Sequence, residues 1–273
     1  MLTLALLRTE LVKQFRRMRT YVAFGIVVLI PVIMTIALDL NPPDRPGQDR
    51  GGLLFFAART GLVVPAAALR FTSAFLLVIV VALFGGDAIA GEASWGNLRY
   101  LLMRPIARTR LVLTKLAVSV FYAWVAVVLV VVAGLVAGVL AFGWEPLTLP
   151  LSGFSQSTGE ILGHLGFSTV YVAWNLTGVV AFSFMLSCMT DTPGGAVFGG
   201  VGLYFTSLIL DSIEPLGSIR YVLPTHYFDA WVDLVLRGDW SSDLWRGFGL
   251  QLGYVLVFAL LGLWWFRRKD ILS

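Results

Sequence analysis

The chain has 273 residues, of which 58% are hydrophobic and only 13% are charged, and its mean hydropathy is +0.84. This composition excludes an ordinary soluble globular protein, because apolar runs of about 20 residues, the length that crosses a bilayer, recur along the chain. The single cysteine, Cys188, excludes an intrachain disulfide and a cysteine-based zinc site.

The first 19 residues are predicted to form an amphipathic helix. Leu4, Leu7, Leu11, Phe15 and Met18 fall on one stripe at helical spacing. Because the cations follow the apolar residues and no small-residue cleavage site accompanies the next apolar run, a cleaved signal peptide is not expected. Two interpretations stay open, a helix lying in the cytoplasmic interface and a solvated basic leader. The cations of this segment are Arg8, Lys13, Arg16, Arg17 and Arg19.

Six apolar runs predict six transmembrane helices in one all-α membrane domain that covers residues 1–273. The third run is long enough to tilt strongly or to project into water. Two shorter apolar segments, 50–65 and 219–237, are too short or too charged to span and are expected to dip into or lie on the outer leaflet, the second as short helices before the last span. The predicted spans are 20–39, 66–90, 111–142, 167–190, 194–211 and 248–266.

The distribution of charge predicts the orientation. If the N-terminus, residues 88–115, the loop at 190–193 and the C-terminus share one side, that side holds 13 of the 20 cations, including every lysine. The positive-inside rule then places both termini in the cytoplasm. Because topology accounts for the basic pI of 9.4, a nucleic-acid partner is not expected. The thirteen cations are Arg8, Lys13, Arg16, Arg17, Arg19, Arg99, Arg104, Arg108, Arg110, Lys115, Arg267, Arg268 and Lys269.

The stretch between the second and third spans, "GDAIAGEASWGNLRYLLMRPIARTRLVLTK", is unusually charged. Asp87 and Glu92 are expected to mark where the second span leaves the bilayer, because an unpaired carboxylate inside it is costly. "WGNLRYLLMR" predicts a short amphipathic helix that Pro105 ends. The residues alone leave two interpretations open, a rigid cytoplasmic knob that transmits force from a soluble partner and an ordinary interfacial loop.

The same stretch resembles the signature of type-2 ABC exporter permeases. The usual pattern is an acidic residue, E-x-x-x-G-T-L-R-x-L-L, P-[IV]-x-R and a lysine that opens the third span. Asn97 departs from it, where the family usually has threonine. The matching residues are Glu92, Gly96, Leu98, Arg99, Leu101, Leu102, Pro105, Ile106, Arg108 and Lys115.

The resemblance implies that residues 91–110 form a coupling loop, with a coupling helix that docks on a separate ATP-binding subunit. It further implies that the N-terminal helix packs beside that loop, and that the permease is a homodimer or a related heterodimer. Spans one, two and five of both copies would line the route, surrounded by lipids of a bacterial cytoplasmic membrane. The implied coupling residues are Glu92, Gly96, Asn97, Leu98, Arg99, Leu102, Arg104, Pro105 and Arg108, and those of the interface helix are Arg8, Lys13, Arg16 and Arg17.

No ATPase site is expected on this chain. A P-loop needs a lysine after a glycine to neutralise phosphate charge, and none of Lys13, Lys115 and Lys269 follows a glycine. ATP and Mg²⁺ are therefore expected on the partner, and this chain is expected to be a transport subunit without a cofactor or metal of its own. His226 and Asp229 are spaced so that both side chains could bind one metal ion. Two ligands do not make a metal site, however, and a polar outer turn is the alternative.

Polar residues inside the predicted spans are candidates for a translocation path. They are Asn175, Thr206 and Ser207, and the competing interpretation is hydrogen bonding between helices. Gly195 and Gly199 have the GxxxG spacing of close helix packing, which also occurs at 134/138 and 249/253. Two other functions stay open, an integral-membrane enzyme and a non-transporting sensor or regulator of the same architecture. The sequence does not indicate a substrate.

Overall fold

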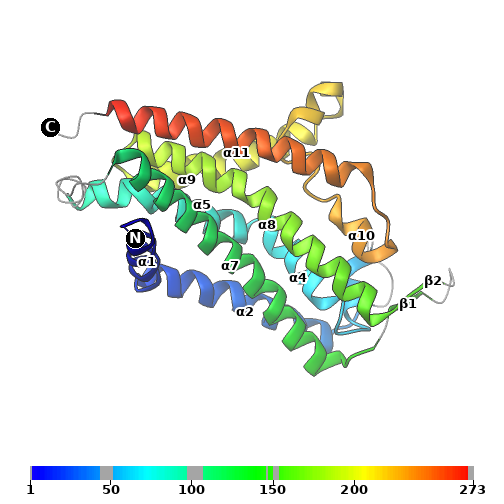
Figure 1. Ribbon diagram of the computed structural model, residues 1–273. Helices are drawn as coiled ribbons and strands as arrows, with labels where there is room; N and C mark the ends of the chain where they lie inside the picture. The colour runs from blue at the N-terminus through cyan, green and yellow to red at the C-terminus, as the bar shows by residue number, and fades with distance from the viewer. Residues whose placement is uncertain (1, 44–51, 97–106, 146, 150–153, 270–273) are drawn as a thin grey trace.

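The structure is a computed structural model that describes residues 2–43, 52–96, 107–145, 147–149 and 154–269 (Figure 1). These residues are almost entirely helical, and they contain six helices that are long and apolar enough to cross a membrane. The chain is therefore a multi-pass membrane protein, as predicted. The six helices are α2 (Met18–Leu40), α5 (Leu76–Ser94), α7 (Arg108–Phe142), α8 (Thr158–Met189), α9 (Pro193–Asp211) and α11 (Ser242–Arg268).

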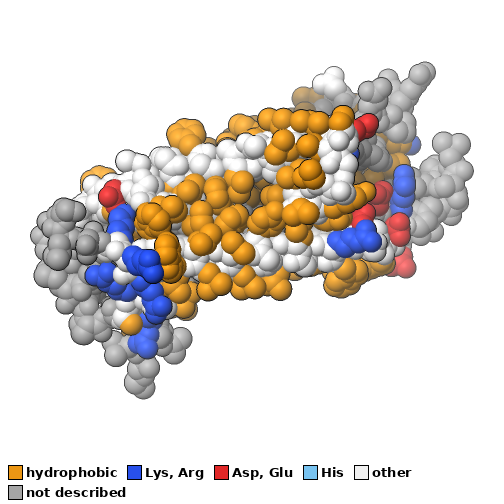
Figure 2. Space-filling view, turned by 90° about the horizontal axis from the view of Figure 1, so that it is seen from above, with side chains coloured by type: hydrophobic (Ala, Val, Ile, Leu, Met, Phe, Trp, Pro, Cys, Tyr) orange, Lys and Arg blue, Asp and Glu red, His pale blue; other side chains and the backbone are white. Residues whose placement is uncertain are grey.

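The six long helices run side by side, with α5 and α8 in the middle and mostly buried (Figure 1). Between the two ends of the bundle, the face seen in Figure 2 is a belt of hydrophobic side chains, and the charged side chains gather at the ends. Leu29 and Ile33 of α2 and Leu256 and Leu260 of α11 are among the exposed apolar residues. Such a belt matches the hydrocarbon core of a bilayer.

The segments predicted to share one side of the membrane lie at one end of the bundle. Both termini are at that end in Figure 1. There Lys269 Nζ lies 2.6 Å from Asp191 Oδ1, and Arg108 Nη1 donates to the carbonyl oxygen of Lys269 at 3.4 Å. The ends of α7, α8 and α11 therefore meet. Which side of the membrane this end faces stays a prediction.

The predicted span 66–90 is wrong, because it is two helices, α4 (Val64–Ser73) and α5. At the break, Thr72 Oγ1 donates to the carbonyl oxygen of Ala68 at 2.7 Å, and Ser73 Oγ donates to that of Arg70 at 3.2 Å. Side chains that bond to nearby carbonyls favour bends and helix ends. Phe75 then leaves the helical backbone, at φ −143° and ψ −61°. Of the two, α5 alone is long and apolar enough to cross a membrane, while α4 is buried against α7.

Elements at the opposite end of the bundle were predicted only in outline. The segment 50–65 holds the short helix α3 (Leu53–Ala57) and the start of α4, and 219–237 holds the last part of the 3₁₀ helix η2 (Glu214–Val222) and all of α10 (Trp231–Arg237). Strands β1 (Leu147–Leu149) and β2 (Phe154–Gln156) pair antiparallel, a hairpin that an all-α prediction omits.

Two predicted span starts are too late. α8 begins nine residues before residue 167, because Ser157 and Glu160 form a capping box: Ser157 N donates to Glu160 Oε2 at 2.8 Å and Glu160 N to Ser157 Oγ at 3.3 Å. α11 begins at Ser242 rather than at residue 248. In both helices the first turns are polar, so hydropathy alone did not indicate them.

The predicted N-terminal helix is shorter than residues 1–19. Helix α1 (Leu2–Phe15) ends before a turn at Arg16 and Arg17, and Thr20 Oγ1 donates to the carbonyl oxygen of Gln14 at 2.8 Å across it. Leu7 and Leu11 pack against the core, as the stripe predicts, whereas Phe15 and Met18 are exposed. The stripe is interrupted because Met18 belongs to α2.

Candidate functional site

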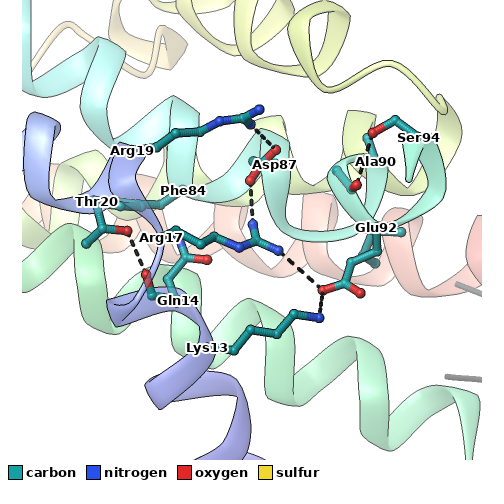
Figure 3. A network of polar contacts seen from close by, with 12 residues as sticks. Lys13, Gln14, Arg17, Arg19, Thr20, Phe84, Asp87, Ala90, Glu92 and Ser94 are labelled. Carbon is teal, nitrogen blue, oxygen red and sulfur yellow. Dashed lines mark hydrogen bonds and ion pairs between the residues drawn. The ribbon is translucent and has the colours of Figure 1, made fainter. Parts of the chain in front are cut away.

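Seven charged side chains from three parts of the chain form one ionic network at the cation-rich end of the bundle, and Figure 3 shows the part of it between the N-terminal region and α5. The N-terminal region supplies two residues of α1, one of the following turn and one of α2. The second half of α5 supplies two carboxylates, and the first turns of α7 supply a lysine. The ionic network consists of Glu10, Lys13, Arg17, Arg19, Asp87, Glu92 and Lys115.

Glu92 is the centre of the ionic network. A single carboxylate oxygen, Oε1, lies 2.5 Å from Lys13 Nζ, 3.1 Å from Lys115 Nζ and 3.4 Å from Arg17 Nη2. These cations come from α1, α7 and the α1–α2 turn. One atom therefore joins three elements that are far apart in the sequence.

Asp87, one and a half turns earlier on α5, holds the start of α2. Arg17 Nη1 lies 2.5 Å from Asp87 Oδ2, and Arg19 Nη1 lies 2.7 Å from Asp87 Oδ1. Figure 3 shows the Arg17 guanidinium reaching Asp87 with one nitrogen and Glu92 with the other. Arg17 thus bridges both carboxylates, a geometry that its planar fork permits and a lysine cannot reproduce.

Helix α1 is also fastened to α7 directly. Lys115 Nζ donates to Glu10 Oε2 at 2.8 Å, and the Tyr122 hydroxyl donates to the carbonyl oxygen of Leu11 at 2.7 Å. Together with Leu7 and Leu11, these contacts fix α1 against the bundle. The interface helix is therefore a packed part of the fold.

Burial makes the ionic network energetically important. The side chains of Glu92 and Lys115 are 1% and 3% exposed, whereas those of Lys13 and Arg17 are 38% and 24% exposed. Removing one member of a buried pair costs about 3–5 kcal/mol, because the remaining charge is left without compensation. The ionic network is thus a fixed joint, in which Glu92 is enclosed by the protein rather than exposed to solvent. Asp87 is likewise enclosed, with a side chain 6% exposed.

A polar cavity of about 330 Å³ borders the ionic network on its open side and is lined in part by Arg17, Arg19, Asp87 and Trp95. Trp95 is 75% exposed, and Gly96 follows it with φ +69°, a left-handed conformation that glycine adopts without strain. Helix α5 therefore ends at Ser94, just before this turn. Within the described chain, Glu92 Oε2 is buried and has no hydrogen-bond partner.

Most of the predicted coupling helix lies outside the described residues: Asn97, Leu98, Arg99, Leu102, Arg104 and Pro105. Of the predicted coupling residues that are described, Glu92 is in the ionic network and Gly96 ends α5. Arg108 instead opens α7, where it donates to the carbonyl oxygens of Arg267 and Lys269 and so caps the end of α11.

The structure divides the predicted cations of the interface helix into two groups. Lys13 and Arg17 face the carboxylates of α5, and Arg8 and Arg16 are exposed. Sequence reasoning named Lys13, Arg17 and Glu92 as site residues, and it placed Lys115 in the motif without a role. It missed Glu10 and the pairing of Arg19 with Asp87. The available signal was the presence of ionisable residues in or next to apolar runs, which require partners.

The three path candidates have separate surroundings. Asn175 Nδ2 donates to the carbonyl oxygen of Tyr171 at 2.9 Å, Ser207 Oγ is 2.7 Å from Thr225 Oγ1, and Thr206 is exposed. The structure does not bring them together. Gly195 is exposed, and a side chain at Gly199 would meet the flexible end of Leu186.

Polar residues at the opposite end of the bundle are paired with one another. His226 Nδ1 lies 2.5 Å from Asp211 Oδ1, and Asp229 Oδ2 lies 2.8 Å from Arg70 Nη2, so His226 and Asp229 have different partners. Within the described ranges, no group of three or more His, Cys, Asp or Glu side chains is placed to hold a metal ion.

Comparison with known proteins gives a family. The model of a family described as a protein of unknown function (DUF2705) matches residues 54–272 of the 273. The chain belongs to this family. The DUF2705 match includes Asp87, Glu92 and Lys115 but begins after the four network residues of α1, the turn and α2. No curated protein matches the sequence.

Proposed function

We propose that this chain is the membrane-spanning permease subunit of an ATP-driven exporter and works as a dimer with separate ATP-binding subunits. Two observations support the proposal. One is the resemblance of residues 87–115 to the signature of type-2 ABC exporter permeases. The other is the ionic network, which joins α1, α5 and α7 on both sides of that segment.

The ionic network is the observation that carries the proposal. A loop that only connects two helices needs no ties to a third element, whereas a lever must be rigid where it enters the membrane. The ion pairs of Glu92 with Lys13 and Lys115 connect the end of α5, which precedes residues 97–106, to α1 and α7. A push on this segment would therefore move three helices together, as rigid-body mechanisms require. No covalent step on this chain is involved.

The test is co-purification of the ATP-binding subunit from native membranes, followed by ATP-dependent transport in reconstituted vesicles. Arg104→Ala removes a cation from the proposed docking segment, and Lys13→Met breaks one tie to Glu92. We expect Arg104→Ala to reduce co-purification by about 10-fold or more, as loss of one member of a desolvated interfacial pair does. We expect Lys13→Met to retain the partner and to reduce transport per ATP hydrolysed.

Arg237→Gln is the matched control, because Arg237 pairs with Asp233 at 3.7 Å on an exposed surface at the opposite end. It should behave as wild type. If both test variants also keep wild-type co-purification and coupling, residues 97–106 are an ordinary loop and the proposal is wrong. A chain that binds the ATPase without moving any cargo would instead be a sensor or regulator.

A further inference from the structure

An apolar groove of about 590 Å³ lies beside the break between α4 and α5. Its walls come from Ile30 of α2, Leu53 and Leu54 of α3, and residues on both sides of the break. Among the described lining residues, Arg70 alone is charged. The volume is within the range of about 300–1,000 Å³ that ligand sites occupy.

The groove faces the bilayer at a defined depth. Phe71 and Phe75, which line it, are 64% and 58% exposed. Helix α5 has 19 residues and so rises about 28 Å, close to the hydrocarbon thickness of about 30 Å. The ionic network extends along α5 to Asp87, which follows Leu76 by 11 residues, and Ile30 lies in the middle of α2. The groove therefore lies in the half of the bilayer away from the ionic network, with Arg70 at the end that meets Asp229.

Arg70 gives the groove a donor for an anion. Its Nη2 donates to Asp229 Oδ2 at 2.8 Å, and the side chain is 28% exposed, so part of it stays accessible. A guanidinium has five N–H donors and suits phosphate geometry. An ionisable residue at this depth is expected to serve a function or to have a partner, and one carboxylate does not exhaust its donors.

We propose that this groove binds an anionic phospholipid, with an acyl chain on the apolar walls and the headgroup phosphate at the Arg70 guanidinium. A lipid satisfies both parts of the site, whereas the apolar face of a second protein copy would cover Arg70 without offering an acceptor. The inference goes beyond the proposed function, because lipid binding requires neither the ATPase nor transport.

The test uses the purified full chain in a neutral detergent. Phosphatidylglycerol and phosphatidylcholine with identical acyl chains are titrated separately, and bound lipid is counted by native mass spectrometry. Wild type should bind phosphatidylglycerol about 10-fold more tightly, because phosphatidylglycerol has a net negative charge, whereas the choline cation of phosphatidylcholine offsets the charge of its phosphate and repels the Arg70 guanidinium. Arg70→Gln combined with Asp229→Asn removes both charges at nearly constant shape and should abolish this preference.

A second variant tests the groove itself. Ala74→Trp places an indole in the groove from a half-buried lining position and should reduce binding of both lipids. Arg220→Gln is the control, because Arg220 lies 3.5 Å from Asp211 at the outer end and does not line the groove. Three results would each overturn the proposal. The first is equal binding of both lipids by wild type, and the second is a preference for phosphatidylglycerol that survives in the double variant. The third is unchanged lipid binding in Ala74→Trp together with an altered oligomer size.

Discussion

A single carboxylate oxygen can decide how the cation-rich end of this protein is built. Glu92 Oε1 accepts from three cations, so its removal affects α1, the α1–α2 turn and α7 simultaneously. Lys115 is the most enclosed of these cations and would retain only Glu10 as a partner. Glu92 therefore fixes the positions of α1, the α1–α2 turn and α7 relative to α5. This effect is specific to these elements, unlike the stability that apolar packing gives to the whole bundle.

Glu92→Ala should lower the stability of the purified protein strongly, by about 3–5 kcal/mol. The physical reason is that Lys115, with a side chain 3% exposed, loses one of its two carboxylates in a site that water does not reach. Thermal unfolding in detergent measures the change as a fall in Tm. Asp233→Ala is the control, since Asp233 pairs at 3.7 Å on an exposed surface where such pairs contribute about 0–1 kcal/mol. Equal Tm changes for the two variants would contradict a buried joint.

The sequence predicted which residues gather in the ionic network better than it predicted which of them are in contact. Charge counting placed Lys13, Arg17 and Lys115 at one end of the molecule, and the structure agrees. It did not show that Glu92 is buried, because an apolar run followed by a carboxylate is also typical of a helix leaving the bilayer. Burial follows from α1 folding back onto α7, a tertiary contact between residues more than 100 positions apart.

Among the helices, glycine determines how closely the central pair can approach. A Cβ on Gly85 of α5 would lie 2.5 Å from the Val180 carbonyl oxygen of α8, a rigid backbone atom. By contrast, nothing lies within 4 Å of a Cβ on Gly249, although Gly249 and Gly253 have the GxxxG spacing. Spacing alone therefore does not distinguish a packed glycine from an exposed one.

Gly85→Ala should destabilise the protein by about 1–3 kcal/mol, because the added methyl group forces α5 and α8 apart. Gly249→Ala should be neutral or stabilise by up to about 1 kcal/mol, because alanine is the better helix former and the site is open. The Tm of both variants in one detergent gives the comparison. The reverse order would show that α5 and α8 are not in close contact.

Helix existence was predictable and helix ends were not. Each of the six predicted runs overlaps one of the six span-length helices, since bilayer thickness requires that length whatever the tertiary structure. The ends depend on side chains that bond to the backbone, such as the Ser157 and Glu160 capping box and the hydroxyls of Thr72 and Ser73. These bonds involve polar residues, to which a hydropathy pattern is insensitive.

For the whole molecule, the orientation can be tested with two introduced cysteines. Ser218→Cys and Arg8→Cys are at exposed positions near opposite ends. A membrane-impermeant thiol reagent on intact cells should label position 218, and it should label position 8 only after the membrane is opened, as the positive-inside rule predicts. The native Cys188 is fully buried and should stay unlabelled in both cases, so it serves as an internal control. Labelling of position 8 on intact cells would invert the topology.

The ionic network has a consequence for the order in which the chain enters the membrane. Arg17 and Arg19, the partners of Asp87, are synthesised before α5, whereas Lys115 follows Glu92 by 23 residues. Helix α5 alone would carry two carboxylates into hydrocarbon, which is costly, but α7 is the most hydropathic of the six long helices and inserts readily by itself. Nascent α5 should therefore remain at the edge of the translocation machinery until α7 emerges, and the two should then leave it for the lipid as a pair.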